Sequence, residues 1–305
     1  MNPKMGFADH ISKNYGLSVG DEKLSMSAKA GAASIRDEIR WTEFEKTQGN
    51  FGPDWQLQAW FDGMEKTQQS KFAILGYYMP GRTQKGLPRT PADMEAFKSF
   101  ITAVLEYTKD MKIDYELWNE QNMNVNADYG YVEDYVNLAK MVYPLVKEIN
   151  PDAKLYVLAT ANVATVREYI EECFKLGIGD YCDGITIHPY NVALPPDDPE
   201  SQADVYDIVA LMEKYGLSDK ELVFSEYGYT SSVNYGNEDR QANYTLQGAA
   251  TYQDVADRIY WYNLQEKTTG TMSDGELHFG MIRGWANTEI LCEPKPTFLV
   301  FSNYN

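Results

Sequence analysis

Two patterns of hydrophobic and polar residues alternate along this chain. Short apolar or aromatic runs are typical of buried strands, and each is followed by a longer stretch. In the longer stretches apolar residues recur every three or four positions, as on one face of a helix. Eight runs are expected to form strands: 4–9, 33–39, 72–78, 113–119, 154–159, 184–188, 221–225 and 258–262.

The stretches between these runs predict helices. Thr90 before Pro91 indicates a helix start, and Asn150 before Pro151 indicates a helix end. The expected helices cover 54–71, 91–109, 131–150, 165–176, 201–215 and 240–257, and a last one begins near Pro296. Eight strands that alternate with helices favour a parallel (β/α)8 TIM barrel, of the α/β class, over a doubly wound sheet. No linker or repeat divides the sequence, so we expect one catalytic domain over residues 1–305.

Composition narrows the possible partners. The chain has 305 residues and a formal net charge of −18, which argues against binding to nucleic acid. No run of 18 apolar residues predicts a membrane span, and no signal peptide is visible. The three cysteines form no CxxC or Cys/His cluster, although a Cys173–Cys182 bridge is possible. No glycine-rich phosphate loop is evident either, so we expect neither a metal nor a cofactor.

Two glutamates stand at the ends of expected strands. Glu120 closes Leu-Trp-Asn-Glu at 117–120, and Glu226 closes Val-Phe-Ser-Glu at 223–226. In barrel enzymes such positions carry the chemistry, and two carboxylates that face one bond can split a glycoside. Asn119, beside Glu120, is suited to hydrogen-bond a substrate hydroxyl. The alternative for Glu120 is a structural ion pair with an arginine in the barrel mouth.

Further candidates surround the two glutamates. A nucleophilic carboxylate must stay ionised, and Arg36 and Tyr190 are candidates to supply a charge and a phenolic donor to Glu226. The alternatives are an ion pair of Arg36 with Asp37 or Glu38, and a core position for Tyr190. His188, at the end of its strand, is expected in the site as a substrate-binding residue and not as a metal ligand.

Three aromatic residues are candidates for stacking on sugar rings. Trp261 lies on the eighth expected strand, Trp41 lies in the loop after the second, and Tyr78 ends the third, where the next loop begins. The alternative for Trp261 is packing in the barrel wall.

Five segments, in order along the chain, resemble motifs of clan A glycoside hydrolases, and the likeness is greatest to family 39. They are 35–51 (Ile-Arg through Gly-Asn-Phe), 118–122 (Trp-Asn-Glu-Gln-Asn), 187–190 (Ile-His-Pro-Tyr), 224–228 (Phe-Ser-Glu-Tyr-Gly) and 279–283 with 295–296. The resemblance implies a (β/α)8 barrel and retaining hydrolysis, with Glu120 as acid/base and Glu226 as nucleophile. The β-sandwich domain of family 39 β-xylosidases is expected to be absent, which argues against a xylosidase.

The main hypothesis is therefore a retaining β-glycoside hydrolase that acts within a polysaccharide chain. Long loops after several strands carry aromatic and amide side chains, such as Trp55, Asn124 and Tyr129, that could line an open groove. The alternatives are an exo-acting β-xylosidase or β-glucosidase, and a non-catalytic carbohydrate-binding barrel. An oligo- or polysaccharide substrate indicates a secreted or periplasmic protein, with a cytoplasmic location left open. The sequence gives no oligomeric state.

Overall fold

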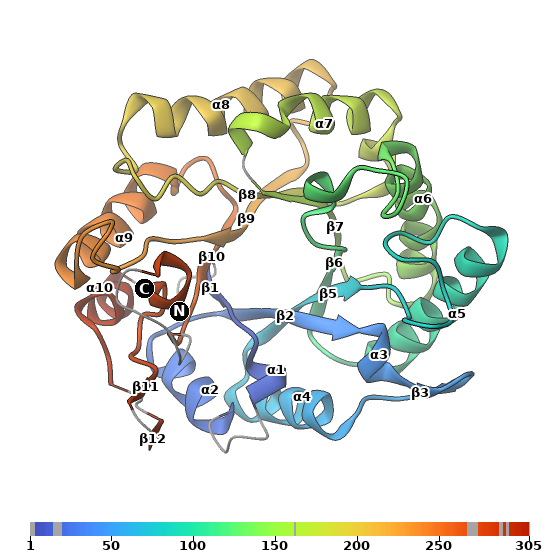
Figure 1. The fold of residues 1–305 in the computed structure, drawn as a ribbon, viewed down its shortest axis with the longest axis horizontal. Helices are drawn as coiled ribbons and strands as arrows, with labels where there is room; N and C mark the ends of the chain where they lie inside the picture. The colour runs from blue at the N-terminus through green and yellow to red at the C-terminus, as the bar shows by residue number, and fades with distance from the viewer. Residues whose placement is uncertain are drawn as a thin grey trace.

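The expected strands form a closed barrel in which every strand is parallel to its neighbours, so the (β/α)8 fold is confirmed (Figure 1). The order around the barrel is β1-β10-β9-β8-β7-β6-β5-β2, which closes the first strand against the last. The computed structural model describes residues 4–14, 20–161, 163–266, 274–286, 289–290 and 293–304. The barrel strands are β1 (Met5–Ala8), β2 (Ser34–Arg40), β5 (Ser70–Gly76), β6 (Ile113–Leu117), β7 (Leu155–Ala161), β8 (Gly184–His188), β9 (Glu221–Tyr227) and β10 (Arg258–Tyr262).

Helices surround the barrel as an outer ring (Figure 1). The Thr90 side chain accepts a hydrogen bond from the Asp93 amide and caps α5, which confirms the predicted start. The helices are α1 (Ile11–Asn14), α2 (Gly20–Lys29), α3 (Trp41–Phe44), α4 (Trp55–Thr67), α5 (Pro91–Thr108), α6 (Val132–Ile149), α7 (Val163–Lys175), α8 (Pro199–Lys214), α9 (Glu238–Tyr252) and α10 (Pro296–Tyr304).

Several short elements were not predicted. Helix α2 lies between the first two barrel strands, and Leu24 and Met26 are the only large apolar residues in its polar sequence. A small hairpin pairs β3 (Glu45–Thr47) with β4 (Asn50–Phe51), and Gly49 supplies the positive φ of 77° that its tight turn needs. A second pair joins β11 (Trp285–Ala286) to β12 (Glu289–Ile290). The four strands of these two pairs have only two or three residues each, too few to show a period in the sequence.

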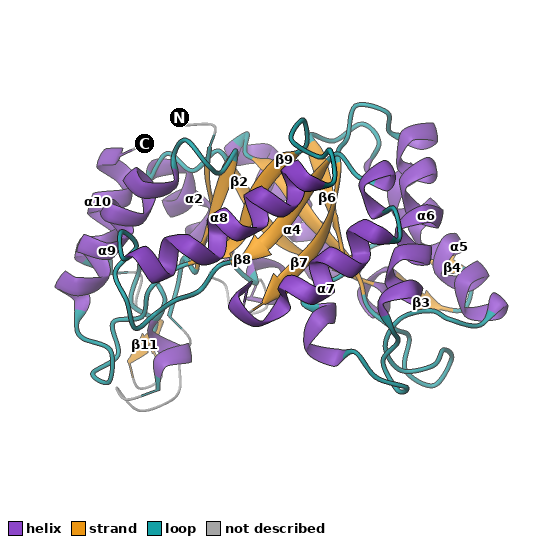
Figure 2. Ribbon diagram, turned by 90° about the horizontal axis from the view of Figure 1, so that it is seen from above, coloured by secondary structure: helices purple, strands orange, loops and turns teal. Residues whose placement is uncertain are grey.

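Side-chain alternation along each strand divides the core into two regions. Inside the barrel, Phe72, Tyr156, Val223 and Tyr260 pack together and fill its centre. Residues that point outward meet the helices and form the larger region between the barrel and the outer ring. The loops that follow the strand ends gather on one side of the barrel, the lower side in Figure 2.

Two cysteines are buried and free. The possible Cys173–Cys182 bridge is not formed. Burial raises the pKa of the Cys182 thiol to about 12, so it stays protonated at neutral pH. Cys292 lies outside the described residues.

No helix within the described ranges combines the length and the apolar character that crossing a membrane requires.

Tyr135 of α6 connects the helical layer to two neighbouring barrel strands, β6 and β7. Its buried hydroxyl donates to the Leu117 carbonyl (2.8 Å) and accepts from the Leu158 amide (2.7 Å). Tyr135→Phe should lower the free energy of unfolding by about 2 kcal/mol, because two buried backbone groups lose their partner. Urea denaturation measures this loss. Tyr206→Phe, at an exposed tyrosine of α8, is the control, and equal midpoints for the two variants would contradict the role of Tyr135.

Candidate active site

A cleft of about 430 Å³ opens at the end of the barrel where the strands finish. Every barrel strand, or the loop that follows it, contributes to its wall. The lining residues are His10, Glu38, Ile74, Asn119, Glu120, Met123, Ala161, Tyr190, Val192, Glu226, Tyr262, Glu276 and Phe279. A larger hollow of about 600 Å³ lies at the opposite end of the barrel. We place the site in the smaller cleft, because barrel enzymes carry their chemistry at the carboxyl ends of the strands.

A bulge in β7 sets the position of Glu120. Leu158 and Ala159 have positive φ angles of 90° and 43°, and the pairing of β7 with β8 shifts at this point. The Ala159 carbonyl accepts a hydrogen bond from the Glu120 amide (2.9 Å). Glu120 is itself left-handed, with a φ of 50°. Such conformations are costly for residues other than glycine and are concentrated at functional sites, which supports a site at this turn.

Glu226 projects from the end of β9 toward two hydrogen-bond donors and a histidine. Arg36 Nη1 donates to one carboxylate oxygen (2.7 Å), and the Tyr190 hydroxyl donates to the other (3.0 Å). His188 Nδ1 lies 3.9 Å from that second oxygen. The side chain of Glu226 is 15% exposed, whereas that of Glu120 is 34% exposed. Glu226 is thus the enclosed member of the pair, and Glu120 is the one that meets solvent.

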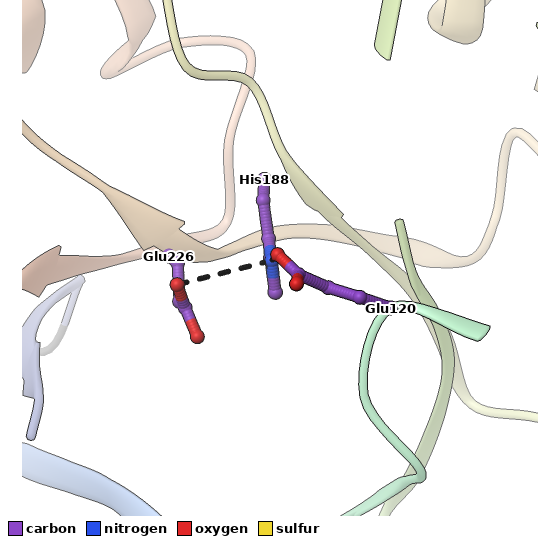
Figure 3. Close-up of side chains that lie close together, drawn as sticks. All are labelled: Glu120, His188 and Glu226. Atoms are coloured by element: carbon purple, nitrogen blue, oxygen red, sulfur yellow. Dashed lines mark hydrogen bonds and ion pairs between the residues drawn. The ribbon is translucent and has the colours of Figure 1, made fainter. Parts of the chain in front are cut away.

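His188 lies between the two carboxylates, fully buried (Figure 3). Its Nδ1 is 2.9 Å from Glu120 Oε1, and its Nε2 is 3.0 Å from Ser225 Oγ and 3.4 Å from Arg36 Nη2. A guanidinium can only donate, so in the neutral ring Nε2 is assigned as the acceptor and Nδ1 carries the hydrogen that faces Glu120. His188 therefore donates to Glu120 and holds its carboxyl group in place.

The surroundings of Glu226 favour its ionised form. Burial alone would raise the pKa of this carboxyl. The nearby His188 and Arg36, with hydrogen bonds from Arg36 and Tyr190, outweigh burial and bring the pKa below its ordinary value. Glu226 is therefore an anion at neutral pH.

The guanidinium of Arg36 donates to three side chains at the bottom of the cleft. Its Nε donates to Glu116 Oε2 (2.7 Å), its Nη1 to Glu226, and its Nη2 to Asn119 Oδ1 (2.7 Å). The alternative in which Arg36 pairs with Asp37 or Glu38 is wrong. Asp37 faces the other side of β2 and accepts from Ser12, and its burial raises its pKa to about 7.

Glu38 faces the cleft and forms ion pairs with two basic side chains. Lys13 and Arg40 donate to it at 2.7 and 2.6 Å, and the Tyr77 hydroxyl donates at 3.0 Å. Burial alone would raise the pKa of Glu38, but Arg40, His10 and Lys13 outweigh it and lower the pKa to about 2. Glu38 is therefore a permanent negative charge in the wall.

Two aromatic candidates do not reach the cleft, so their expected stacking on substrate is not supported. Trp41 is fully buried, stacks on Phe100 of α5 at 5.5 Å between ring centroids, and donates to Glu45. Trp261 is also buried, and it points outward from β10 toward α9. The reason is strand alternation, because Trp261 faces the helices and the next residue, Tyr262, faces the cleft.

Tyr78 is half-buried and does not line the cleft. The other candidates, Arg36, Asn119, His188 and Tyr190, lie in it or touch the two glutamates.

Sequence reasoning missed part of the wall and the buried partner of Arg36. The wall also includes His10, which follows β1, and Tyr262, which ends β10. Glu276 and Phe279, which come after β10 in the chain, belong to it as well. Glu116 carried a usable signal, because in β6 the apolar residues at 113, 115 and 117 alternate with acids at 114 and 116. That alternation predicts acids inside the barrel, where a buried charge needs a partner.

Glu120, His188 and Glu226 also form a group that could hold a metal ion. One ligand atom from each lies within 4.8 Å of the others. Arg36 already binds Glu226 and approaches His188, and its positive charge opposes a second cation at this place.

The fold is shared with several solved glycoside hydrolases. A family 39 glycoside hydrolase from the gut symbiont Bacteroides cellulosilyticus WH2 matches with a TM-score of 0.80 and 21% identity, over 99% of this chain and 63% of that one. A monomeric β-xylosidase from Caulobacter crescentus CB15 matches with a TM-score of 0.75 and 16% identity, over 99% and 67%. An exo-β-1,4-mannosidase from Opitutaceae bacterium strain TAV5 matches with a TM-score of 0.74 and 12% identity, over 99% and 58%.

No family model and no curated protein matches the chain. The chain spans less than two thirds of the first of these solved structures. At these identities the comparisons establish the fold, and in the fold the resemblance to family 39 expected from the sequence is confirmed.

Proposed function

We propose that the chain is a retaining β-glycoside hydrolase with Glu120 as acid/base and Glu226 as nucleophile. The observation that carries the proposal is the approach of these two side chains, because one carboxyl oxygen of each lies within 4.8 Å of the other in one cleft. Retaining enzymes hold their carboxyl groups about 5–5.5 Å apart, whereas inverting enzymes leave roughly 6.5–9.5 Å for a water. The separation here supports double displacement.

The environments of the two glutamates fit these roles. Glu226 is enclosed and kept ionised by Arg36 and Tyr190, as a nucleophile requires. Glu120 is more exposed and so can meet the leaving group and later a water. Arg36 holds the Asn119 amide by its oxygen, which leaves the amide nitrogen to donate to a substrate hydroxyl.

The reaction then follows in two steps. Glu226 attacks the anomeric carbon, the glycosidic bond breaks, and Glu120 transfers its proton to the leaving oxygen. The product of this step is a glycosyl ester on Glu226. Glu120, now a carboxylate, takes a proton from a water, which attacks the anomeric carbon and releases Glu226. Two inversions at this carbon give net retention.

The shape of the cleft supports action on a chain end better than action within a chain. All eight strands, or the loops that follow them, surround it, whereas an open groove would need two open sides. The loop residues expected to line a groove, such as Trp55 and Tyr129, do not line this cleft. The β-xylosidase and the exo-mannosidase among the structures with this fold are further support for the exo alternative.

The first test removes each carboxylate. Glu226→Ala should abolish turnover because no covalent intermediate forms. Glu120→Ala should lower turnover of natural glycans by about 10²–10⁴-fold while sparing aryl glycosides with good leaving groups, which need no proton. Azide should partly rescue this second variant and give a β-glycosyl azide, detected by NMR. Near-native activity of either variant on a natural glycan would refute the assignment, and a sugar-binding barrel would release no product even as wild type.

The second test reads the products. NMR of the first-formed product should show the β-anomer, and an initial α-anomer would make Glu226 a general base. Chromatography of early digests separates the modes of action. Monosaccharide or disaccharide from the first minutes supports a pocket, whereas mixed oligosaccharides with a fast fall in viscosity would support the groove.

A further inference from the structure

Arg36 lies between two carboxylates that compete for its charge. Glu116 Oε2 accepts from Arg36 Nε at 2.7 Å and lies 2.6 Å from Nη2, while Glu226 holds only Nη1 at 2.7 Å. Glu116 is fully buried and Arg36 is 3% exposed, so water screens neither. The other oxygen of Glu116 has no hydrogen-bond partner among the described residues. The carboxylate of Glu116 is thus committed to Arg36 alone.

We infer that Glu116 is a positioning residue that takes part of the charge of Arg36 away from Glu226 and so keeps Glu226 a stronger nucleophile. The inference rests on the proposed function for its catalytic consequence. The expected effect on the pKa of Glu226 involves only side chains within the described ranges, so it is measurable without any substrate.

Glu116 acts on Glu226 in two ways, and both make Glu226 a stronger base. A buried anion on the far side of Arg36 repels the charge of Glu226 and favours its protonated form. Glu116 also draws the guanidinium toward β6 and away from β9. Removal of the charge at position 116 should therefore make Glu226 a weaker base. If Glu116 served only to hold Arg36 in place, its loss would free Arg36 and make Glu226 a stronger base, which is the opposite change.

Other titratable groups also face this pair and must stay in place for the comparison. The groups around Arg36, Glu116 and Glu226 are His10 after β1, Tyr77 after β5, Glu120 after β6, Tyr135 of α6, His188 of β8, Tyr190 after β8 and Tyr262 of β10. Substitution at position 116 changes none of them directly.

The test is a pH titration of Glu226 by ¹³C NMR of protein labelled at the glutamate carboxyl carbon, with the signal assigned from Glu226→Gln. Glu116→Gln keeps the shape and removes the charge, so the pKa of Glu226 should fall by about one unit. Glu116→Asp keeps the charge but shortens the reach toward Arg36, so a smaller fall is expected. Tyr190→Phe is the control of opposite sign, because it removes a donor to Glu226 and should raise its pKa.

A pKa of Glu226 that is unchanged or higher in both Glu116 variants would overturn the inference. The same variants test whether the change in the pKa of Glu226 also changes catalysis. The acidic limb of kcat/KM on an aryl glycoside should move to lower pH in Glu116→Gln by the shift that NMR measures. If the wild type cleaves no glycoside, the proposed function fails while the NMR titration still decides the role of Glu116.

Discussion

A buried guanidinium organises the mouth of this barrel. Arg36 is nearly inaccessible to water, and a charge in that position is tolerable only when other groups surround it. Its partners Glu116, Asn119 and Glu226 come from β6, the turn after it, and β9, so they meet only when the barrel is closed. Barrel closure and charge compensation therefore depend on each other, and a misregistered strand would leave a buried ion without a partner.

The opposite end of the barrel has its own arginine. Arg258 donates to Asp114 (2.9 Å) and to Glu221 (3.3 Å), and its guanidinium lies over the ring of Tyr156. Between the two arginines lies the aromatic layer that includes Phe72 and Tyr260. Charged side chains thus lie at both ends of an apolar interior. At one end the acids and bases pair with each other, and at the other two glutamates face an open cleft.

The sequence revealed those features that depend on local pattern. The strands emerged because a buried run of apolar residues between helices has few other interpretations, and Glu120 and Glu226 emerged because each closes such a run. Partners across the barrel were not accessible in the same way. Arg36 pairs with Glu116 and Glu226, far away in sequence. It does not pair with Asp37, because neighbours along a strand point to opposite faces, and Glu38 binds Lys13 and Arg40 instead.

The alternation of side chains along β10 explains why Trp261 does not reach the cleft. The pattern Tyr-Trp-Tyr at 260–262 places aromatic rings on both faces of β10, and composition does not show which face is the inner one. Tyr260 and Tyr262 point inward, and Trp261 packs against Tyr227 beneath α9. The bulge in β7 was equally invisible, since neither leucine nor alanine indicates a left-handed backbone.

That bulge has a consequence for anyone who wishes to change what this cleft accepts. Positions 158 and 159 hold a rare backbone shape that directs the Glu120 turn, so β-branched residues there would disturb the turn even though neither side chain touches the cleft. Met123 and Val192 line the same cleft from loops, and Met123 is 54% exposed. A combinatorial library should therefore randomise the loop positions and keep Leu158 and Ala159 unchanged. Positions that tolerate change and positions that must be kept thus serve the same cleft, the first by lining it and the second by shaping the turn that carries Glu120.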